Sequence, residues 1–147
     1  MTEDLEQFKE VFVSESKENL SALNALLVHL ENTPEDTNLL NEIFRAAHTL
    51  KGMAATMGYE KITELSHEME NVLAALKEGQ VKPGAGVVNI LLDCFDCLEM
   101  MVEEVATGRE KGVDLAAALG KLRSVVNAQP SANLPGLPAP PPAARPG

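Results

Sequence analysis

The stretch FRAAHTLKGMAATMG, residues 44–58, has the pattern of an amphipathic helix that ends at a glycine. Its apolar residues recur at the helical spacing and form one stripe. His48 and Lys51 lie beside that stripe, and Gly52 lies on the solvent side. A glycine inside a helix costs about 1 kcal/mol relative to alanine. We therefore expect Gly52 to serve a purpose, which is to leave the imidazole open to the close approach of another protein.

The helical period recurs on both sides of this stretch and predicts five helices. The first covers about residues 4–32, and its apolar face includes Leu5, Phe8 and Phe12. The others are a second helix after Thr33-Pro34, a third over about 60–78, a fourth over about 86–107 and a last helix after Asp114. Neither β-branched alternation nor Asn-Gly turns occur, so the sequence gives no sign of strands.

Four residues are expected to mark helix boundaries. The Thr33 hydroxyl is suited to cap the second helix, with Pro34 at the first helical position. Gly58 suits the left-handed conformation that stops a helix, and Asp114 is placed to cap the last one.

Short connections between long amphipathic helices favour antiparallel neighbours. We therefore predict an all-α fold, an up-down antiparallel four-helix bundle with an additional C-terminal fifth helix. The composition agrees, because 45% of the residues are hydrophobic but only 3% are aromatic, which suits an aliphatic helical core. Residues 1–127 form the predicted domain. Residues 128–147 hold seven of the nine prolines and form a predicted Pro/Ala-rich flexible linker, as in one module of a longer protein.

The charge of the chain excludes some partners. The formal net charge is −10, and no run of lysine and arginine is present, which argues against nucleic acid and against an anionic membrane surface. No apolar run approaches the roughly 20 residues that span a bilayer. The N-terminus, MTEDLEQFKE, is acidic and unlike a signal peptide, so we expect a cytoplasmic protein.

A hairpin of the second and third helices around Gly58 would bring two polar positions to the same height. His48 lies ten residues before this glycine and Glu70 lies twelve after it. A carboxylate there can accept the proton of one imidazole nitrogen and leave the other nitrogen with an outward lone pair. Such an imidazole is a competent nucleophile, and Lys51 nearby would favour a phosphoryl group.

The residues FRAAHTLKGMAATMG and the later SHEMENVLAALKEG resemble the signature of histidine phosphotransfer domains. The likeness is to the N-terminal phosphotransfer domains of the CheA family of chemotaxis histidine kinases, and it covers about residues 5–127. By position, the resemblance implies that His48 is the phosphorylated histidine and Glu70 its hydrogen-bonding carboxylate. Lys51 and His67 would supply the rest of the polar network.

The resemblance also implies a mechanism and a set of partners. A separate kinase catalytic domain binds ATP and Mg and phosphorylates the histidine, and a response regulator of the CheY or CheB type takes the group on an aspartate. The chain has no phosphate-binding loop, so we expect a phosphoryl carrier without a cofactor of its own and without kinase activity by itself. The family dimerises through a different domain, which implies a monomer here.

Other interpretations stay open from the sequence. His48, His67 and Glu70 are possible ligands of a metal-binding bundle, although no second Glu-x-x-His motif accompanies them. Cys94 and Cys97 form a C-x-x-C motif, but they lie inside a helix next to acids that raise a thiol pKa, so buried reduced cysteines are expected. A phosphorelay outside chemotaxis and a helical bundle that only binds a partner are further alternatives.

Overall fold

Five helices make up most of residues 2–128, the part of the chain that the computed structural model describes. No strand occurs within this range, as the sequence predicts. The helices are α1 (Thr2–Asn32), α2 (Thr37–Met57), α3 (Glu60–Lys77), α4 (Ala85–Thr107) and α5 (Leu115–Ala128). Residues 129–147, nearly all of the predicted linker, lie outside the described residues.

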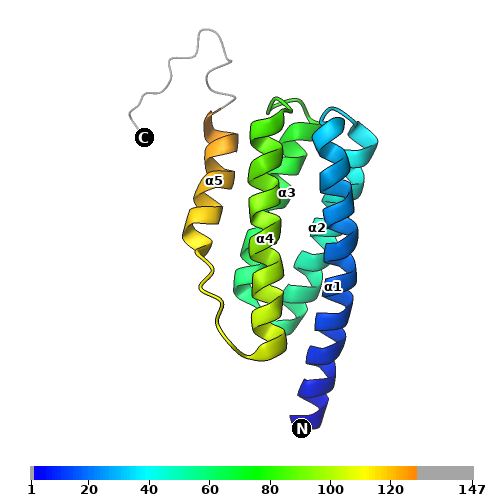
Figure 1. The fold of residues 1–147 in the computed structure, drawn as a ribbon, viewed down its shortest axis with the longest axis vertical. Helices are drawn as coiled ribbons and strands as arrows, with labels where there is room; N and C mark the ends of the chain where they lie inside the picture. Colours follow the sequence, from blue (N-terminus) through cyan, green and yellow to red (C-terminus); the bar gives the residue numbers. More distant parts are fainter. Residues whose placement is uncertain (1, 129–147) are drawn as a thin grey trace.

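The first four helices form the predicted up-down antiparallel bundle. α1 packs against α2 and α4, and α3 packs against the same two helices from the opposite corner (Figure 1). The interior is aliphatic. Its largest fully buried side chains are Leu23, Leu27, Leu30, Ile43, Leu50, Ile62, Leu65, Met69, Leu73, Leu91, Leu98 and Met101. These come from all four helices, so a single core holds the bundle together.

Asp36 rather than Thr33 caps α2, which corrects the sequence prediction. The Asp36 Oδ1 accepts a hydrogen bond from the backbone N–H of Leu39 at 3.1 Å. The Thr33 hydroxyl instead donates to the carbonyl of His29 at 3.3 Å, at the end of α1. The reason is that residues 33–36 form a turn, which delays the start of α2 by three residues relative to Pro34.

The other two boundary predictions are confirmed. Gly58 ends α2 with φ 78°, a left-handed conformation that glycine adopts without strain. The Asp114 Oδ1 accepts a hydrogen bond from the backbone N–H of Ala117 at 3.0 Å and caps α5. The tight stop at Gly58 allows α3 to begin only two residues later and to run back along α2.

The start of α1 does not belong to the core. Leu5 and Phe8, predicted on the apolar face, are 65% and 60% exposed, and from residue 4 onward Phe12 is the first buried position of the helix. A helix rises about 1.5 Å per residue, so α1 is roughly 10 residues and 15 Å longer than α2. Its first turns therefore extend past the Gly58 end of the bundle (Figure 1). The rings of Phe12 and Tyr59 pack edge to face, with their centroids 4.9 Å apart.

The fifth helix is attached to the bundle, on α3 and α4. Its buried side chains are Ala118, Leu119, Leu122 and Val125. At the rim, Arg123 pairs with Glu64 and Glu68 of α3 at 3.6 Å and 3.3 Å. Surface ion pairs are worth little individually, so the apolar contacts contribute most of the attachment.

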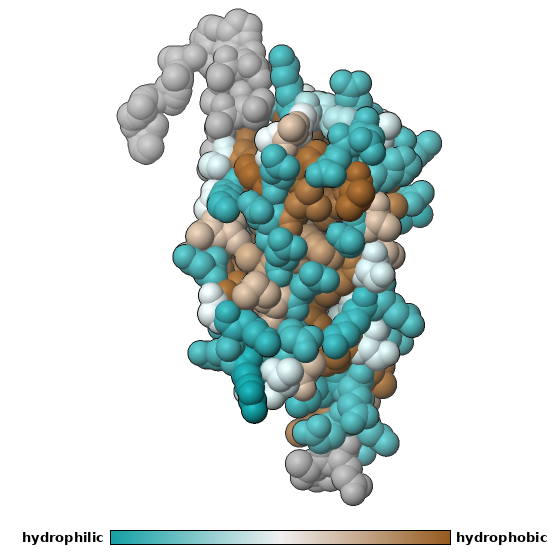
Figure 2. Space-filling model, in the orientation of Figure 1, coloured by the Kyte–Doolittle hydropathy of each residue, from teal (hydrophilic) through white to brown (hydrophobic). Residues whose placement is uncertain are grey.

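Hydrophilic side chains cover much of the face shown in Figure 2, with apolar side chains visible between them. Within the described residues, no helix combines the length and the apolar character that crossing a membrane requires.

The two cysteines are free thiols inside α4, and the predicted burial holds for Cys94, whereas Cys97 is half-buried. Cys94 is fully buried, and its Sγ donates to the carbonyl of Ala118 in α5 at 3.8 Å. Burial, followed by the charges of Cys97 and Asp93, raises the pKa of the Cys94 thiol to about 12. Burial and the charge of Asp96 also raise the pKa of Cys97. Thiols with raised pKa values are poor nucleophiles, which disfavours redox chemistry at this motif.

The buried thiol makes the stability of the bundle sensitive to alkaline pH. The Cys94 pKa is about 12 in the folded chain against the ordinary 9.0, so the unfolded chain loses this proton first as pH rises. The free energy of unfolding should therefore fall by about 1.4 kcal/mol between about pH 8 and pH 10 through this group alone. Urea denaturation of the wild type and of Cys94→Ala measures it. The variant should lose less stability over this interval, and equal losses would contradict the assignment.

Candidate functional site

His48 and Glu70 meet across the hairpin of α2 and α3. The His48 Nδ1 lies 2.8 Å from the Glu70 Oε2, within hydrogen-bond distance. The imidazole side chain is 64% exposed, whereas the carboxylate side chain is only 8% exposed. The structure therefore contains the juxtaposition of His48 and Glu70 that was predicted by counting residues from Gly58. The carboxylate lies inside the bundle and the imidazole lies at the surface.

Lys51 completes the bonding of the same carboxylate. Its Nζ donates to the Glu70 Oε1 at 3.0 Å, so the two oxygens of Glu70 each have a partner on α2. His48 and Lys51 are three residues apart and share one side of the helix. A buried carboxylate is strongly disfavoured without such partners, and here a cation and an N–H group both compensate its charge.

The hydrogen bond to Glu70 determines which imidazole nitrogen is free. Because a carboxylate only accepts hydrogen bonds, the His48 Nδ1 must carry the proton in this contact. In the neutral ring the Nε2 then holds an available lone pair. The exposure of the side chain leaves that nitrogen open to a reagent carried by another protein. The arrangement is chemically that of an oriented imidazole nucleophile.

His67 lies outside this bonded cluster. Its side chain is exposed on α3, where it borders a surface hollow next to Gly58 and Glu60. The structure gives it no hydrogen bond to His48, Lys51 or Glu70. The resemblance implies a place for His67 in the supporting polar network, but in the structure its side chain is exposed whereas that of Glu70 is buried.

Phe44 is a neighbour of the imidazole that the sequence did not single out. Its ring lies almost parallel to that of His48, with the centroids 6.4 Å apart and 4° between the planes. The i, i+4 spacing of the two residues on one helix was the available signal. It was missed because Phe44 also fits the apolar stripe of α2, and its side chain is in fact half-buried.

Gly52 is exposed inside α2, and a Cβ atom added there would meet nothing within 4 Å. Packing within the described residues therefore does not require this glycine. The open space lies at i+4 from His48, on the same side of the helix. That another protein approaches the imidazole here stays a prediction.

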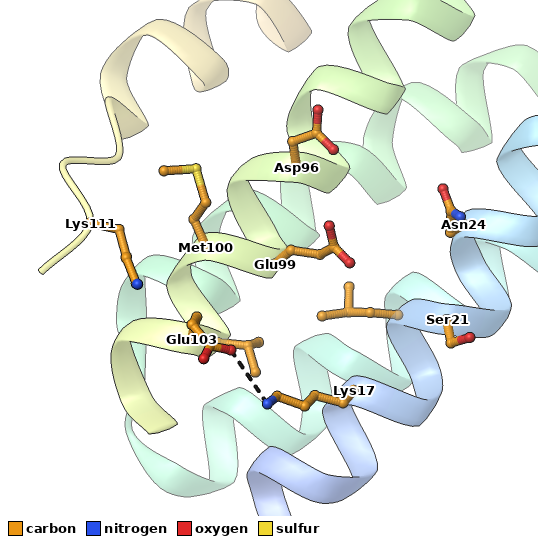
Figure 3. Close-up of a pocket in the computed structure, with 10 residues that line it drawn as sticks. Lys17, Ser21, Asn24, Asp96, Glu99, Met100, Glu103 and Lys111 are labelled. Carbon is orange, nitrogen blue, oxygen red and sulfur yellow. Dashed lines mark ion pairs between the residues drawn. The ribbon is translucent and has the colours of Figure 1, made fainter. Parts of the chain in front are cut away.

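A surface groove lies elsewhere on the bundle, away from His48. It has a volume of about 820 Å³ and is lined by residues of α1, α4 and the segment before α5. Figure 3 shows the Lys17–Glu103 ion pair across it, at 3.4 Å. None of the polar residues around His48 lines this groove. Residues 2–128 also contain no group of three His, Cys, Asp or Glu side chains arranged to hold a metal ion.

Comparison with known proteins identifies the family of this bundle. The family model described as Hpt domain matches residues 7–108, so the chain belongs to the Hpt domain family. The solved structures that it resembles include phosphotransfer domains of CheA. One is the solution structure of the histidine phosphotransfer domain of CheA, 36% identical over 81% of this chain and 91% of that chain, with a TM-score of 0.72. Another is the CheA phosphotransferase domain from Thermotoga maritima, 40% identical over 69% of this chain and 96% of that chain, with a TM-score of 0.66.

The curated relatives are much longer proteins. Chemotaxis protein CheA of Bacillus subtilis (strain 168) is 43% identical over 81% of this chain, a match that covers 18% of that protein. The chain thus spans about a fifth of the length of the curated relatives it matches.

The geometry makes the His48 tautomer depend on Glu70. Glu70→Gln replaces a pure acceptor by an amide that both donates and accepts, so the Nδ1 is no longer forced to carry the proton. A hydrogen bond to a charged group is worth about 1.5–3 kcal/mol, enough to keep roughly nine-tenths of the ring in one tautomer. We expect ¹⁵N NMR at about pH 8 to show Nδ1–H in the wild type and a mixture in the variant. His67→Gln is the matched control and should leave the His48 signals unchanged. An unchanged His48 spectrum in Glu70→Gln would contradict the assignment.

Proposed function

We propose that this chain is the phosphoryl carrier of a chemotaxis signalling kinase. His48 accepts the γ-phosphoryl group of ATP from a kinase catalytic domain and passes it to an aspartate of a response regulator. The observation that carries the proposal is the exposed imidazole whose Nδ1 is bonded to a buried carboxylate. Membership of the Hpt family and similarity to CheA phosphotransfer domains support it.

In the first step the His48 Nε2 uses its lone pair to attack the γ-phosphorus. An N–P bond forms, the P–O bond to ADP breaks, and ADP leaves with that electron pair. The ring keeps its Nδ1 proton and gains positive charge, which the adjacent Glu70 carboxylate stabilises. The Lys51 ammonium provides a cation beside the charged phosphoryl group.

In the second step a carboxylate oxygen of the response regulator attacks the phosphorus of phosphohistidine. An O–P bond forms, the N–P bond breaks, and the electron pair returns to the Nε2. The neutral imidazole is restored with its Nδ1 proton on the Glu70 side. The chain therefore ends the cycle unchanged, as a carrier must.

The proposal gives each partner a distinct part. The kinase catalytic domain supplies ATP and Mg, and response regulators of the CheY or CheB type supply the accepting aspartate. This chain contributes the nucleophile and its oriented environment and needs no cofactor of its own. Because the donor uses ATP, the proposal also places the reaction in the cytoplasm.

Incubation of the full chain with radiolabelled ATP tests the proposal, with and without an active CheA-type catalytic domain. We expect acid-labile label only when that domain is present, and complete loss of label in His48→Gln. His29→Gln, which removes an exposed histidine of α1, is the matched control and should label normally. Label that persists in His48→Gln, or none in the wild type, would contradict the proposal. Transfer of the label to regulators outside chemotaxis alone would favour a different phosphorelay.

Gly52 offers a separate test of the protein surface around the nucleophile. Gly52→Ala and Gly120→Ala both replace an exposed glycine inside a helix, in α2 and α5, where an added Cβ meets nothing within 4 Å. Each should raise the free energy of unfolding by about 1 kcal/mol. Only Gly52→Ala should also slow phosphorylation, because its methyl group stands where the catalytic domain approaches. Thermal unfolding and initial labelling rates measure the two effects, and equal labelling rates in the two variants would contradict this use of Gly52.

A further inference from the structure

One hydrogen bond does not fix an exposed imidazole. The bond from the His48 Nδ1 to Glu70 holds one ring atom in place, yet the ring plane can still turn about that contact. The direction of the Nε2 lone pair follows the ring plane, so in-line attack on a phosphorus requires the plane to be held as well. With the side chain 64% exposed, few neighbours are available to do so.

The Phe44 ring is placed to hold that plane. It lies one helical turn before His48 on α2, and the two ring planes differ by only 4° at a centroid separation of 6.4 Å. This separation is within the range at which aromatic rings interact. Phe44 is half-buried, so the bundle restricts its movement more than that of the exposed imidazole.

Lys77 contacts the same phenyl ring from α3. Its Nζ lies 4.6 Å from the Phe44 ring centroid, within the distance of a favourable cation–π interaction. Lys77 belongs to the last turn of α3, where a cation is also favoured by the helix dipole. Two residues of α3, seven positions apart, therefore act on the imidazole. Glu70 contacts it directly, and Lys77 contacts the Phe44 ring that lies beside it.

We propose that Lys77 and Phe44 are positioning residues for His48, Lys77 by holding the Phe44 ring and Phe44 by holding the imidazole plane. The role in phosphoryl transfer rests on the proposed function, whereas the effect on the ring does not. Neither residue touches the reacting atoms. The alternative use of an exposed lysine beside a nucleophile is to attract an acidic partner, which would act on binding rather than on the ring.

The variants Phe44→Leu, Lys77→Met and Lys77→Arg separate these two roles, with Lys82→Met as the matched control for an exposed lysine of the next loop. The first readout is ¹³C relaxation of the His48 ring C–H groups in the full chain, which reports ring order without any partner. The second is the split between kcat and KM for phosphorylation by a CheA-type catalytic domain.

We expect Phe44→Leu to lower ring order and to lower kcat about fivefold. Lys77→Met should lower both in the same direction, with kcat falling about threefold, and Lys77→Arg should retain wild-type values because guanidinium also interacts with an aromatic face. KM should stay unchanged in all of them. In the Phe44→Leu background, Lys77→Met should have no further effect, because Lys77 acts through the missing ring.

A raised KM in Lys77→Met with unchanged kcat and ring order would overturn the proposal and assign Lys77 to partner docking. An independent loss in the double variant would overturn it as well. If the wild type is never phosphorylated, the proposed function fails, and the ring order of the variants still decides whether Phe44 and Lys77 hold the imidazole.

Discussion

The buried carboxylate of Glu70 joins the two helices that build the site. One carboxylate oxygen bonds to the Nδ1 of His48 and the other to the Nζ of Lys51. The buried negative charge of Glu70 is therefore compensated by its direct neighbours. Removing one partner of a buried ion pair destabilises a protein far more than replacing both partners by apolar residues. Because Glu70 needs both partners, α2 and α3 must pack in the register that brings His48 and Lys51 to it, and the same register sets the tautomer of the imidazole. The short turn at Gly58 allows this register.

The group that orients the imidazole is buried, whereas the group that reacts is exposed. Glu70 is held inside, where the low dielectric strengthens its hydrogen bonds, and His48 projects outside, where another protein can reach the Nε2. The groove of about 820 Å³ between α1 and α4 includes neither residue. In the proposed function the catalytic domain of the partner supplies the surroundings of the reaction, so the carrier itself needs no substrate pocket.

Periodicity was sufficient for the helices and for the His48–Glu70 pair, because both follow from counting residues around a hairpin. Periodicity was insufficient where the outcome depends on the relative lengths of packed helices, on the conformation of a turn or on contacts between side chains of different helices. Leu5 and Phe8 fit the apolar stripe, yet α1 outruns its neighbours and leaves them exposed. Asp36 caps α2 because residues 33–36 form a turn, and the usual preference for threonine and proline at a helix start did not predict that turn. The contact of Lys77 with Phe44 joins two helices through long side chains, and no spacing along the chain encodes it.

The central claim is that Glu70 directs the chemistry to one nitrogen of His48. The most direct test is to phosphorylate the full chain with a CheA-type catalytic domain and to identify the phosphohistidine isomer by ³¹P and ¹⁵N NMR under alkaline, acid-free conditions. The account predicts phosphorus bonded to the Nε2, with the Nδ1 still facing the carboxylate. Phosphorus bonded to the Nδ1 would contradict it, because that nitrogen is occupied by its contact with Glu70.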